Sequence, residues 1–424
     1  MPSPLLFDAV LFDLDGTLVA TDRFWIQAAK AGARRAFEEL GVERSLPTGE
    51  EWMSLVGLPL AEGFARLFGD LSDAERALLL ERCEEEEGRL IAAGGAAWMP
   101  GAREVMARLR EAGVRLAIAS NCSEGYLTQM RGELGLDEFV EEAWCLDSPG
   151  ISNKADMIER ILERLGTRSA IFVGDRAGDR DSAWANGIPH VHCSFGFAGR
   201  GEEVEAEATI GDMGELLGVL GRRTRWIRSI LEGIGVALGP RGPFVLGVTG
   251  DFASGKTLFA RDAARLLRAH GQDAVAVSIG GAWGRGTAQG SSGPGLDLDR
   301  LELELFEPHA RGEAVELPDA AIADPAGPRV LAGDAVLLAE GSFLLDPRLL
   351  ARLDRALYLG VSEEVMWRRA MGREGRVEGV SALERIRGEL LPALRDHRGH
   401  YRPDRLADRV LDGSNPLGPS PRSA

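Results

Sequence analysis

Two carboxylates near the N-terminus are spaced as a phosphoryl-transfer site would need. Residues 11–18 read Leu-Phe-Asp-Leu-Asp-Gly-Thr-Leu, so Asp13 and Asp15 lie two apart at the end of an apolar strand. Side chains two apart in a strand point to the same side, and burying both is costly unless a cation neutralises them or one holds a proton. The pair suits a carboxylate nucleophile beside a carboxyl general acid/base, with Mg²⁺ screening the phosphate. Taken alone, such a turn also closes strands or binds Ca²⁺.

Three further polar groups follow later apolar runs. Ser120 and Asn121 end one run, where a hydroxyl and a backbone amide can hold a phosphate oxygen. Lys154 precedes a helical stretch and offers a positive charge for a phosphate or for the first carboxylate. Asp175 and Asp179 follow another run and suit a Mg²⁺ shell. We expect all of them at carboxyl ends of strands, where open α/β sheets bind ligands.

In this order the motifs resemble the haloacid dehalogenase superfamily of phosphohydrolases, in particular its phosphoglycolate phosphatase and phosphoglucomutase-like branch, over roughly residues 5–220. The resemblance implies that Asp13 attacks phosphorus, and that Asp15 protonates the leaving oxygen and later activates water. It implies phosphate contacts from Ser120, Asn121 and Lys154. It also implies a Mg²⁺ ion held by Asp13, the Asp15 carbonyl, Asp175 and Asp179.

The elements that position these residues are short apolar runs alternating with amphipathic stretches, which predicts a parallel sheet covered by helices. The predicted strands are Ala9–Phe12, Arg115–Ser120, Ala170–Gly174, Pro189–Cys193 and Ala208–Ile210. Residues 20–97 read as mostly helical and are too long for an ordinary crossover. We interpret them as a cap over the strand ends, which favours a small-molecule phosphate ester as substrate. Its side chains that could face a substrate are Arg23, Trp25, Gln27 and Arg66.

A second motif lies in residues 245–257, where an apolar strand is followed by Gly-x-x-x-x-Gly-Lys-Thr and then by the helical stretch 258–269. Backbone amides of such a loop cradle phosphates, its lysine reaches the β- and γ-phosphates, and its threonine ligates Mg²⁺. The motif predicts a site for ATP or another nucleoside triphosphate. We assign this site to Gly250, Ser254, Gly255, Lys256 and Thr257.

After this loop the α/β alternation continues, with predicted strands at Phe244–Val248, Ala274–Ile279, Ala335–Ala339, Ala356–Gly360 and Arg409–Leu411. Glu340 lies at one strand end, and Arg368, Arg369 and Arg373 share a helical segment. Together these features resemble the uridine kinase and phosphoribulokinase-like P-loop family over about residues 243–413. The arginines could face a phosphate or could simply form a solvated helix face.

One position departs from this kinase pattern. The run 274–279 is followed by Gly280-Gly281-Ala282-Trp283, where the family carries an acidic residue that accepts the proton of the substrate hydroxyl. A general base is often worth about 10²–10⁴-fold in rate, and Asp251, Asp297 or Asp299 would have to replace it. We expect ATP binding and leave three functions open: a phosphatase with a non-transferring kinase-like domain, a bifunctional phosphatase and nucleoside- or sugar-type kinase, or a phosphatase regulated by an ATP sensor.

The predicted fold class is α/β, with two doubly wound parallel-sheet domains: a Rossmann-like one with an inserted helical cap, and a P-loop nucleoside-kinase-like one. We expect the boundaries at 1–220 for the phosphatase domain (cap at about 20–97), 221–242 for a linker, 243–413 for the second domain and 414–424 for a disordered tail.

Composition excludes several classes of protein. The chain of 424 residues is 45% hydrophobic and 27% charged, as in globular proteins. No apolar run reaches the length of a membrane span, and no basic flank suggests a signal peptide. Residues 1–221 carry a net charge of −18 and residues 222–424 of +1, which argues against nucleic-acid binding by the first part. The four cysteines lack metal-ligand spacing, so we expect a reduced, cytoplasmic protein.

Overall fold

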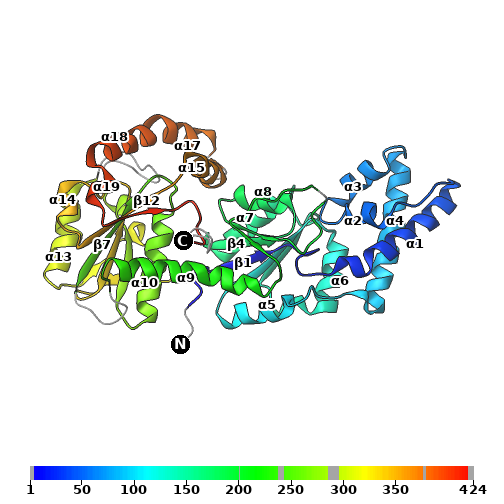
Figure 1. Cartoon of the computed structure of the whole chain (residues 1–424), viewed down its shortest axis with the longest axis horizontal. Helices are drawn as coiled ribbons and strands as arrows, with labels where there is room; N and C mark the ends of the chain where they lie inside the picture. The colour runs from blue at the N-terminus through cyan, green and yellow to red at the C-terminus, as the bar shows by residue number, and fades with distance from the viewer. Residues whose placement is uncertain (1–3, 200, 237–242, 285–295, 376–378, 419–424) are drawn as a thin grey trace. The chain divides into compact units, whose positions relative to one another are not determined.

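The computed structural model describes residues 4–199, 201–236, 243–284, 296–375 and 379–418 (Figure 1). The chain forms two compact units. One unit is Phe7–Val219, and the other is Leu220–Ala424 together with the N-terminal segment Met1–Leu6. The first six residues, which we expected in the first domain, therefore belong to the second unit. Leu6 is part of a buried apolar cluster of that unit.

The sheet of the first unit has six parallel strands in the order β3-β2-β1-β4-β5-β6. Its strands are β1 Ala9–Phe12, β2 Arg115–Ser120, β3 Glu142–Cys145, β4 Ala170–Gly174, β5 His190–Cys193 and β6 Ala208–Ile210. The chain order reverses at β1, and the crevice outside the strand ends at such a point is where open α/β sheets bind ligands. The parallel sheet predicted for this part of the chain is confirmed.

Helices cover both faces of this sheet. Ala9 and Leu11 of β1 pack in one apolar cluster with α7 (Lys154–Leu165) and α8 (Ala177–Trp184). Figure 1 shows α5 (Ala102–Glu111) on the opposite side of the sheet. All four residues of β1 are buried. A strand covered on both faces is apolar throughout rather than alternating, which is why β1 was readable from sequence.

A helical cap is inserted between β1 and α5. It contains α1 Trp25–Leu40, α2 Gly49–Met53, α3 Leu60–Leu67 and α4 Asp73–Leu90, with short turns at Thr21–Arg23 and Ile91–Gly95. Its two ends run side by side, since Ala20 N donates to Ala97 O at 2.9 Å and Met99 N donates to Leu18 O at 2.7 Å. Trp52 packs edge-on or tilted against Trp25, Phe64 and Phe68 within 6.2 Å between ring centroids, which gives the cap a core of its own. The remaining helical elements of this unit are α6 Glu124–Leu134 and a turn at Leu136–Glu138.

The second unit contains a five-stranded parallel sheet in the order β13-β12-β7-β11-β8. Its strands are β7 Phe244–Gly250, β8 Ala274–Ser278, β11 Val336–Glu340, β12 Arg355–Gly360 and β13 Arg409–Asp412. A separate antiparallel pair joins β9 Val315–Glu316 and β10 Val330–Leu331. β7 lies between β11 and β12, so its carboxyl end opens at the centre of the sheet.

Each face of this sheet has its own apolar cluster. On one face, α9 (Glu215–Gly233) and α10 (Lys256–Ala269) pack on β7, β8 and β11. On the other face the cover comes from the segments around Leu301–Phe306 and Leu344–Leu349. The remaining helical elements are α11 Ile279–Ala282, α12 Leu298–Leu301, η4 Glu302–Phe306, α13 Glu307–Ala310, η5 Asp319–Ala321, α14 Pro347–Leu350, α15 Glu363–Ala370, η6 Met371–Gly375, α17 Val380–Arg385, η7 Ile386–Leu390, α18 Leu391–Tyr401 and α19 Pro403–Leu406.

Two boundary predictions need correction. Residues 221–233, expected in a linker, form most of α9, because Ile227, Ile230 and Leu231 recur at helical spacing and are buried in the second unit. Residues 414–418, expected in a disordered tail, lie against the same unit, with Leu417 fully buried. Residues 237–242 of the predicted linker and 419–424 of the predicted tail lie outside the described residues.

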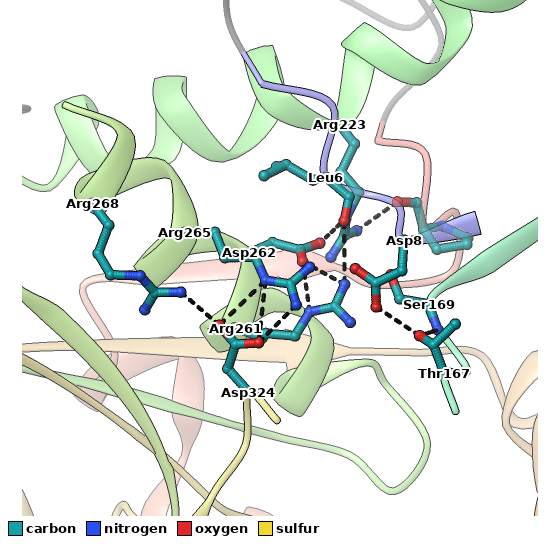
Figure 2. A network of polar contacts seen from close by, with 11 residues as sticks. Leu6, Asp8, Thr167, Ser169, Arg223, Arg261, Asp262, Arg265, Arg268 and Asp324 are labelled. Carbon is teal, nitrogen blue, oxygen red and sulfur yellow. Dashed lines mark hydrogen bonds and ion pairs between the residues drawn. The ribbon is translucent and has the colours of Figure 1, made fainter. Parts of the chain in front are cut away.

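A buried ionic network holds the start, the middle and the end of the second unit together (Figure 2). Asp262 of α10 accepts hydrogen bonds from Arg261, at 2.7 and 3.0 Å, and from Arg223 of α9. Arg261 also donates to Leu6 O at 3.2 Å, and Arg223 to Pro416 O at 2.6 Å. Asp262 is fully buried, so its charge depends on these two guanidinium groups for compensation.

Replacing Asp262 with Ala should therefore destabilise the second unit strongly, by about 3–5 kcal/mol, because two buried cations lose their counter-charge. Hydrogen exchange of α10 and β7 peptides, measured by mass spectrometry, would report the loss where it occurs. Asp319→Ala is the matched control, since Asp319 forms an exposed ion pair with Arg329 and should cost less than about 1 kcal/mol. If α10 and β7 were equally protected from hydrogen exchange in the two variants, the stabilising role assigned to Asp262 would be contradicted.

Candidate active site

A buried lysine joins two of the carboxylates predicted from sequence. Lys154, the first residue of α7, donates from Nζ to Asp13 Oδ1 at 2.7 Å and to Asp179 Oδ1 at 2.6 Å. The three side chains are 1–4% exposed. Asp13 follows β1 directly, and Asp179 lies in α8 just beyond β4. The parallel strands thus bring residues 166 positions apart in sequence into one ionic cluster.

A third acid completes the cluster. Asp13, Asp175 and Asp179 each offer a carboxylate oxygen, and these oxygens lie within 4.8 Å of one another. Asp13 Oδ2 and Asp175 Oδ1 are buried without a hydrogen-bond partner among the described residues, whereas Asp175 Oδ2 accepts from Phe197 N. Buried anionic oxygens without a donor are costly, and a hard cation such as Mg²⁺ prefers oxygen ligands. The residues present therefore fit a Mg²⁺ ion.

Burial controls the charge of these groups. It raises the pKa of Asp13 to about 7, against the opposing effect of the Lys154 ammonium. Burial also raises the pKa of Asp175, and the neighbouring charges of Asp13 and Asp179 raise it further. Burial alone would lower the pKa of Lys154, but the charges of Asp13 and Asp179 outweigh burial and hold this pKa above its usual value. The amine is therefore a permanent cation, whereas burial disfavours the charged forms of Asp13 and Asp175 unless a further cation lies beside them.

The second carboxylate of the first motif has a different environment. Asp15 Oδ1 accepts hydrogen bonds from Thr21 Oγ1 at 2.5 Å and from Tyr126 Oη at 2.6 Å. Burial raises the pKa of Asp15, and these two hydrogen bonds oppose that shift. Two neighbouring carboxyl groups thus differ in role: the side chain of Asp13 faces a cation, and that of Asp15 is oriented by two hydroxyl groups.

A pocket opens beside Asp15, between the cap and the strand ends. Ser120, Asn121 and Trp25 line it, together with residues of the cap. Asn121 has a further contact, because its Nδ2 donates to Gly57 O of the cap at 3.0 Å. Of the cap side chains that we expected near a substrate, only Trp25 lines this pocket. The other three, Arg23, Gln27 and Arg66, are exposed.

The lining residues that the sequence analysis missed include Thr21, Tyr126 and Glu87. Thr21 and Tyr126 belong to no motif, and only their contacts with Asp15 reveal them. Glu87 lies in the run Glu84–Glu87 of α4, a pattern that usually marks a solvated helix face. It is nevertheless only 7% exposed.

In the second unit the glycine-rich loop joins β7 to α10. Gly250 has a φ of +148°, and a Cβ there would lie 2.1 Å from Leu359 O, so only glycine fits. Lys256 Nζ donates to Asp251 O at 2.7 Å, and Thr257 Oγ1 donates to Glu340 Oε1 at 3.0 Å. Burial lowers the pKa of Lys256 to about 8. The loop, its lysine and the acid at the end of β11 therefore lie together.

The other residues assigned to the nucleotide site lie near the same loop. Gly255 has a φ of +88° and starts α10, and the hydroxyl of Ser254 is buried with no hydrogen-bond partner in the described part of the chain. Arg369 donates to Ala253 O at 3.0 Å. Arg373 lies over the ring of Phe252, 5.9 Å from its centroid. These arginines contact the loop rather than forming only a solvated face.

The three acids that could replace the missing proton acceptor already have partners. Gly281 lies where a Cβ would be 2.3 Å from Ala320 O, so an acidic residue cannot replace it without moving the backbone. Asp251 already accepts from Tyr358 Oη at 2.6 Å and from Val361 N at 3.1 Å. The remaining two candidates are also engaged: Asp297 caps α12, and Asp299 pairs with Arg348.

Comparison with known proteins decides the family of the first unit. Residues 10–193 match the model of the haloacid dehalogenase-like hydrolases. A phosphoglycolate phosphatase of Rhodospirillum rubrum is 30% identical over 206 residues, which span 45% of this chain and 80% of that protein. The chain belongs to the haloacid dehalogenase-like hydrolases.

A further relative has a different name, and a solved structure is also similar to this chain. The tyrosine-protein kinase PtkA of Mycobacterium tuberculosis H37Rv is 30% identical over 223 residues, or 50% of this chain and 72% of that protein. The crystal structure of a predicted phosphoglycolate phosphatase from Haemophilus somnus 129pt covers 50% of this chain and 98% of its own, with 18% identity and a TM-score of 0.44. Among the described residues, no helix combines the length and apolar character needed to cross a bilayer.

Removing one carboxylate of the hydrolase cluster should weaken its affinity for the metal. We expect Asp175→Asn to bind Mg²⁺ about 10- to 100-fold more weakly than the wild type, because an anionic oxygen is lost. Titration calorimetry with Mg²⁺ alone measures this directly. Asp181→Asn is the matched control, since Asp181 lies close by in sequence, on α8, but is exposed and paired with Arg180. If Asp175→Asn bound Mg²⁺ as tightly as the wild type, the assignment of a Mg²⁺ site to this cluster would be contradicted.

Proposed function

We propose that the first unit is a Mg²⁺-dependent phosphatase that hydrolyses a small phosphomonoester through an aspartyl-phosphate on Asp13. The observation that carries the proposal is the contact of Asp13 with Lys154 inside a buried cluster of three carboxylates. One oxygen of Asp13 is held by the lysine, and the other has no partner in the described residues. The membership of the chain in the haloacid dehalogenase-like hydrolases supports this chemistry.

The proposed reaction has two steps that use the same pair of acids. In the first, an oxygen of Asp13 attacks phosphorus, the bond from phosphorus to the ester oxygen breaks, and the Asp15 carboxyl gives its proton to the leaving alcohol. In the second, Asp15 takes a proton from water, whose oxygen attacks the same phosphorus and releases inorganic phosphate and free Asp13. Thr21 and Tyr126 orient Asp15 for both transfers.

Charge stabilisation in both steps comes from groups already in place. Lys154 balances negative charge beside Asp13, and Ser120 with the amide of Asn121 would hold phosphate oxygens at the end of β2. Mg²⁺, when bound, would screen the phosphate and the carboxylates against each other. The residues that would hold it are Asp13, the Asp15 carbonyl, Asp175 and Asp179.

The cap favours a small substrate. Two contacts tie it to the core beside the pocket: Asn121 donates to Gly57 O, and Arg176 donates to Val56 O. With the cap in this position, the substrate must fit among Trp25, Leu58 and Tyr126. A phosphate on a small molecule fits this arrangement better than a phosphate on a folded macromolecule.

Purified protein should release phosphate from p-nitrophenyl phosphate only when Mg²⁺ is present, and Asp13→Asn should reduce that release to the background rate. A malachite-green assay over a panel of phosphorylated metabolites, with 2-phosphoglycolate and phosphotyrosine included, measures both effects. Asp181→Asn should remain active. Release that is independent of Mg²⁺, or equal in the wild type and Asp13→Asn, would overturn the proposed function.

For the second unit we propose a P-loop nucleoside-kinase-like fold over residues 243–413 that binds ATP or another nucleoside triphosphate. The supporting observation is the contact of Thr257 with Glu340 beside Lys256 at the central strand of the sheet. Thr257 and Glu340 are the residues that would hold a Mg²⁺ ion with the nucleotide. The candidate acids already have partners, and Gly281 leaves no room for an acidic side chain. Both observations favour nucleotide binding without phosphoryl transfer. They therefore favour the ATP-sensing alternative over the bifunctional kinase.

ATP binding should depend on the lysine of this loop. We expect Lys256→Ala to weaken ATP binding by about 10- to 100-fold, the loss typical of one charge-assisted hydrogen bond. A fluorescent ATP analogue and displacement by ATP give the dissociation constants. Arg329→Ala removes an exposed cation of the same unit and serves as control. Acceptor-dependent ATP consumption by the wild type would favour the bifunctional alternative instead.

A further inference from the structure

The pocket beside Asp15 contains an acid that the proposed phosphatase reaction does not use. Glu87 of the cap helix α4 lines the pocket together with Asp15, Ser120 and Tyr126. It is 7% exposed. Burying a carboxyl is costly, and a hydrogen-bond donor or a cation on a bound ligand would reduce that cost.

The backbone around Glu87 is fixed in place. The next residue, Gly88, accepts a hydrogen bond at its carbonyl oxygen from Gln129 Nε2 of α6, at 2.8 Å. Glu86, the preceding residue, points to a different side of α4 and pairs with Arg35 and Arg89. The helix therefore presents Glu85 and Glu86 to arginines and holds Glu87 against the pocket.

The surroundings of Glu87 are negative. Burial raises the pKa of its carboxyl well above the usual value, and the charges of Asp15 and Glu84 raise it further. The pKa of Glu84, one helical turn earlier, is raised in turn by burial and by Asp147 and Glu81. A second anionic group on a substrate would oppose ionisation of this carboxyl further, whereas an ammonium group would stabilise its charged form.

No basic side chain lines the pocket to compensate. The lining residues include no Lys, Arg or His. Arg176 lies against Gly57 of the cap, but its guanidinium is engaged with Val56 O and with Glu202. Lys154 is buried between Asp13 and Asp179, where it would meet the transferred phosphate rather than the alcohol part of the ester.

We propose that Glu87 is a specificity-determining residue, and that the site takes phosphate monoesters whose alcohol carries an ammonium or hydroxyl donor while it discriminates against esters with a second anion. The inference rests on the proposed phosphatase function and specifies the substrate class of that site. The carboxyl of Glu87 accepts the donor of the leaving alcohol, so the ester oxygen lies toward Asp15. An ammonium group is favoured over a hydroxyl, because it also pairs with the charged form of Glu87.

Three compounds of nearly equal size separate charge from shape: phosphoethanolamine, 2-hydroxyethyl phosphate and 2-phosphoglycolate carry an ammonium, a hydroxyl and a carboxylate on the same two-carbon alcohol. Each is tested as a competitor of p-nitrophenyl phosphate hydrolysis, so that binding is measured whether or not it is turned over. For the wild type we expect the inhibition constants to rise in that order. In Glu87→Gln the ratio between 2-phosphoglycolate and phosphoethanolamine should fall by about tenfold or more, since glutamine cannot form the anion that pairs with an ammonium group.

Glu81→Gln is the matched control, because Glu81 lies on the same helix with an exposed carboxylate; its ratio should equal that of the wild type. A ratio of inhibition constants does not depend on the amount of active enzyme, so partial misfolding of a variant cannot imitate the result. The inference fails if the wild type prefers 2-phosphoglycolate, if Glu87→Gln leaves the ratio unchanged, or if none of the three compounds competes. Failure of the wild type to hydrolyse p-nitrophenyl phosphate would instead overturn the proposed function.

Discussion

One buried ammonium group compensates part of the negative charge at the centre of the first unit, and the proposed site depends on it. Lys154 contacts Asp13 and Asp179 at hydrogen-bond distance inside a cluster that also holds Asp175. One cation cannot compensate three buried carboxylates, so the cluster has a remaining need for positive charge. That need explains why the site would take a divalent cation, and why a phosphate would enter only together with it. The sheet order, which reverses at β1, holds these groups in place.

The cap and α6 provide contacts to Asp15 and to the pocket that the strand ends do not provide. The strand ends position the acids and the lysine, but the groups that orient Asp15 and surround the alcohol part of a substrate come from elsewhere: Thr21 at the start of the cap, Glu87 on α4, and Tyr126 on α6. In the proposed function, residues at the strand ends break the phosphate ester bond, and residues of the cap and of α6 select the alcohol.

Much of the fold could be predicted from sequence because strands buried on both faces are continuous apolar runs, as in β1 and β7. The edge strand β3 (Glu142–Cys145) was missed, since its first three residues are only half-buried and such a position permits polar residues. Asp13, Asp175 and the phosphate loop were readable because each follows a strand directly, and Lys154 because it begins a helix. Glu87 was not, because its neighbours in sequence are also acidic and only the rotation of α4 distinguishes it. Residues 221–233 were assigned to a linker because the arginines of α9 interrupt the apolar stripe of this helix.

The central claim is that Asp13 carries the phosphoryl group, and chemical trapping tests it most directly. Borohydride reduces an acyl-phosphate on aspartate to homoserine, so protein quenched during turnover of p-nitrophenyl phosphate should show homoserine at residue 13 by peptide mass spectrometry. The account predicts that modification at Asp13, and its disappearance when substrate is omitted. Turnover without a trapped residue, or homoserine at Asp15 or Asp175 in place of Asp13, would contradict it.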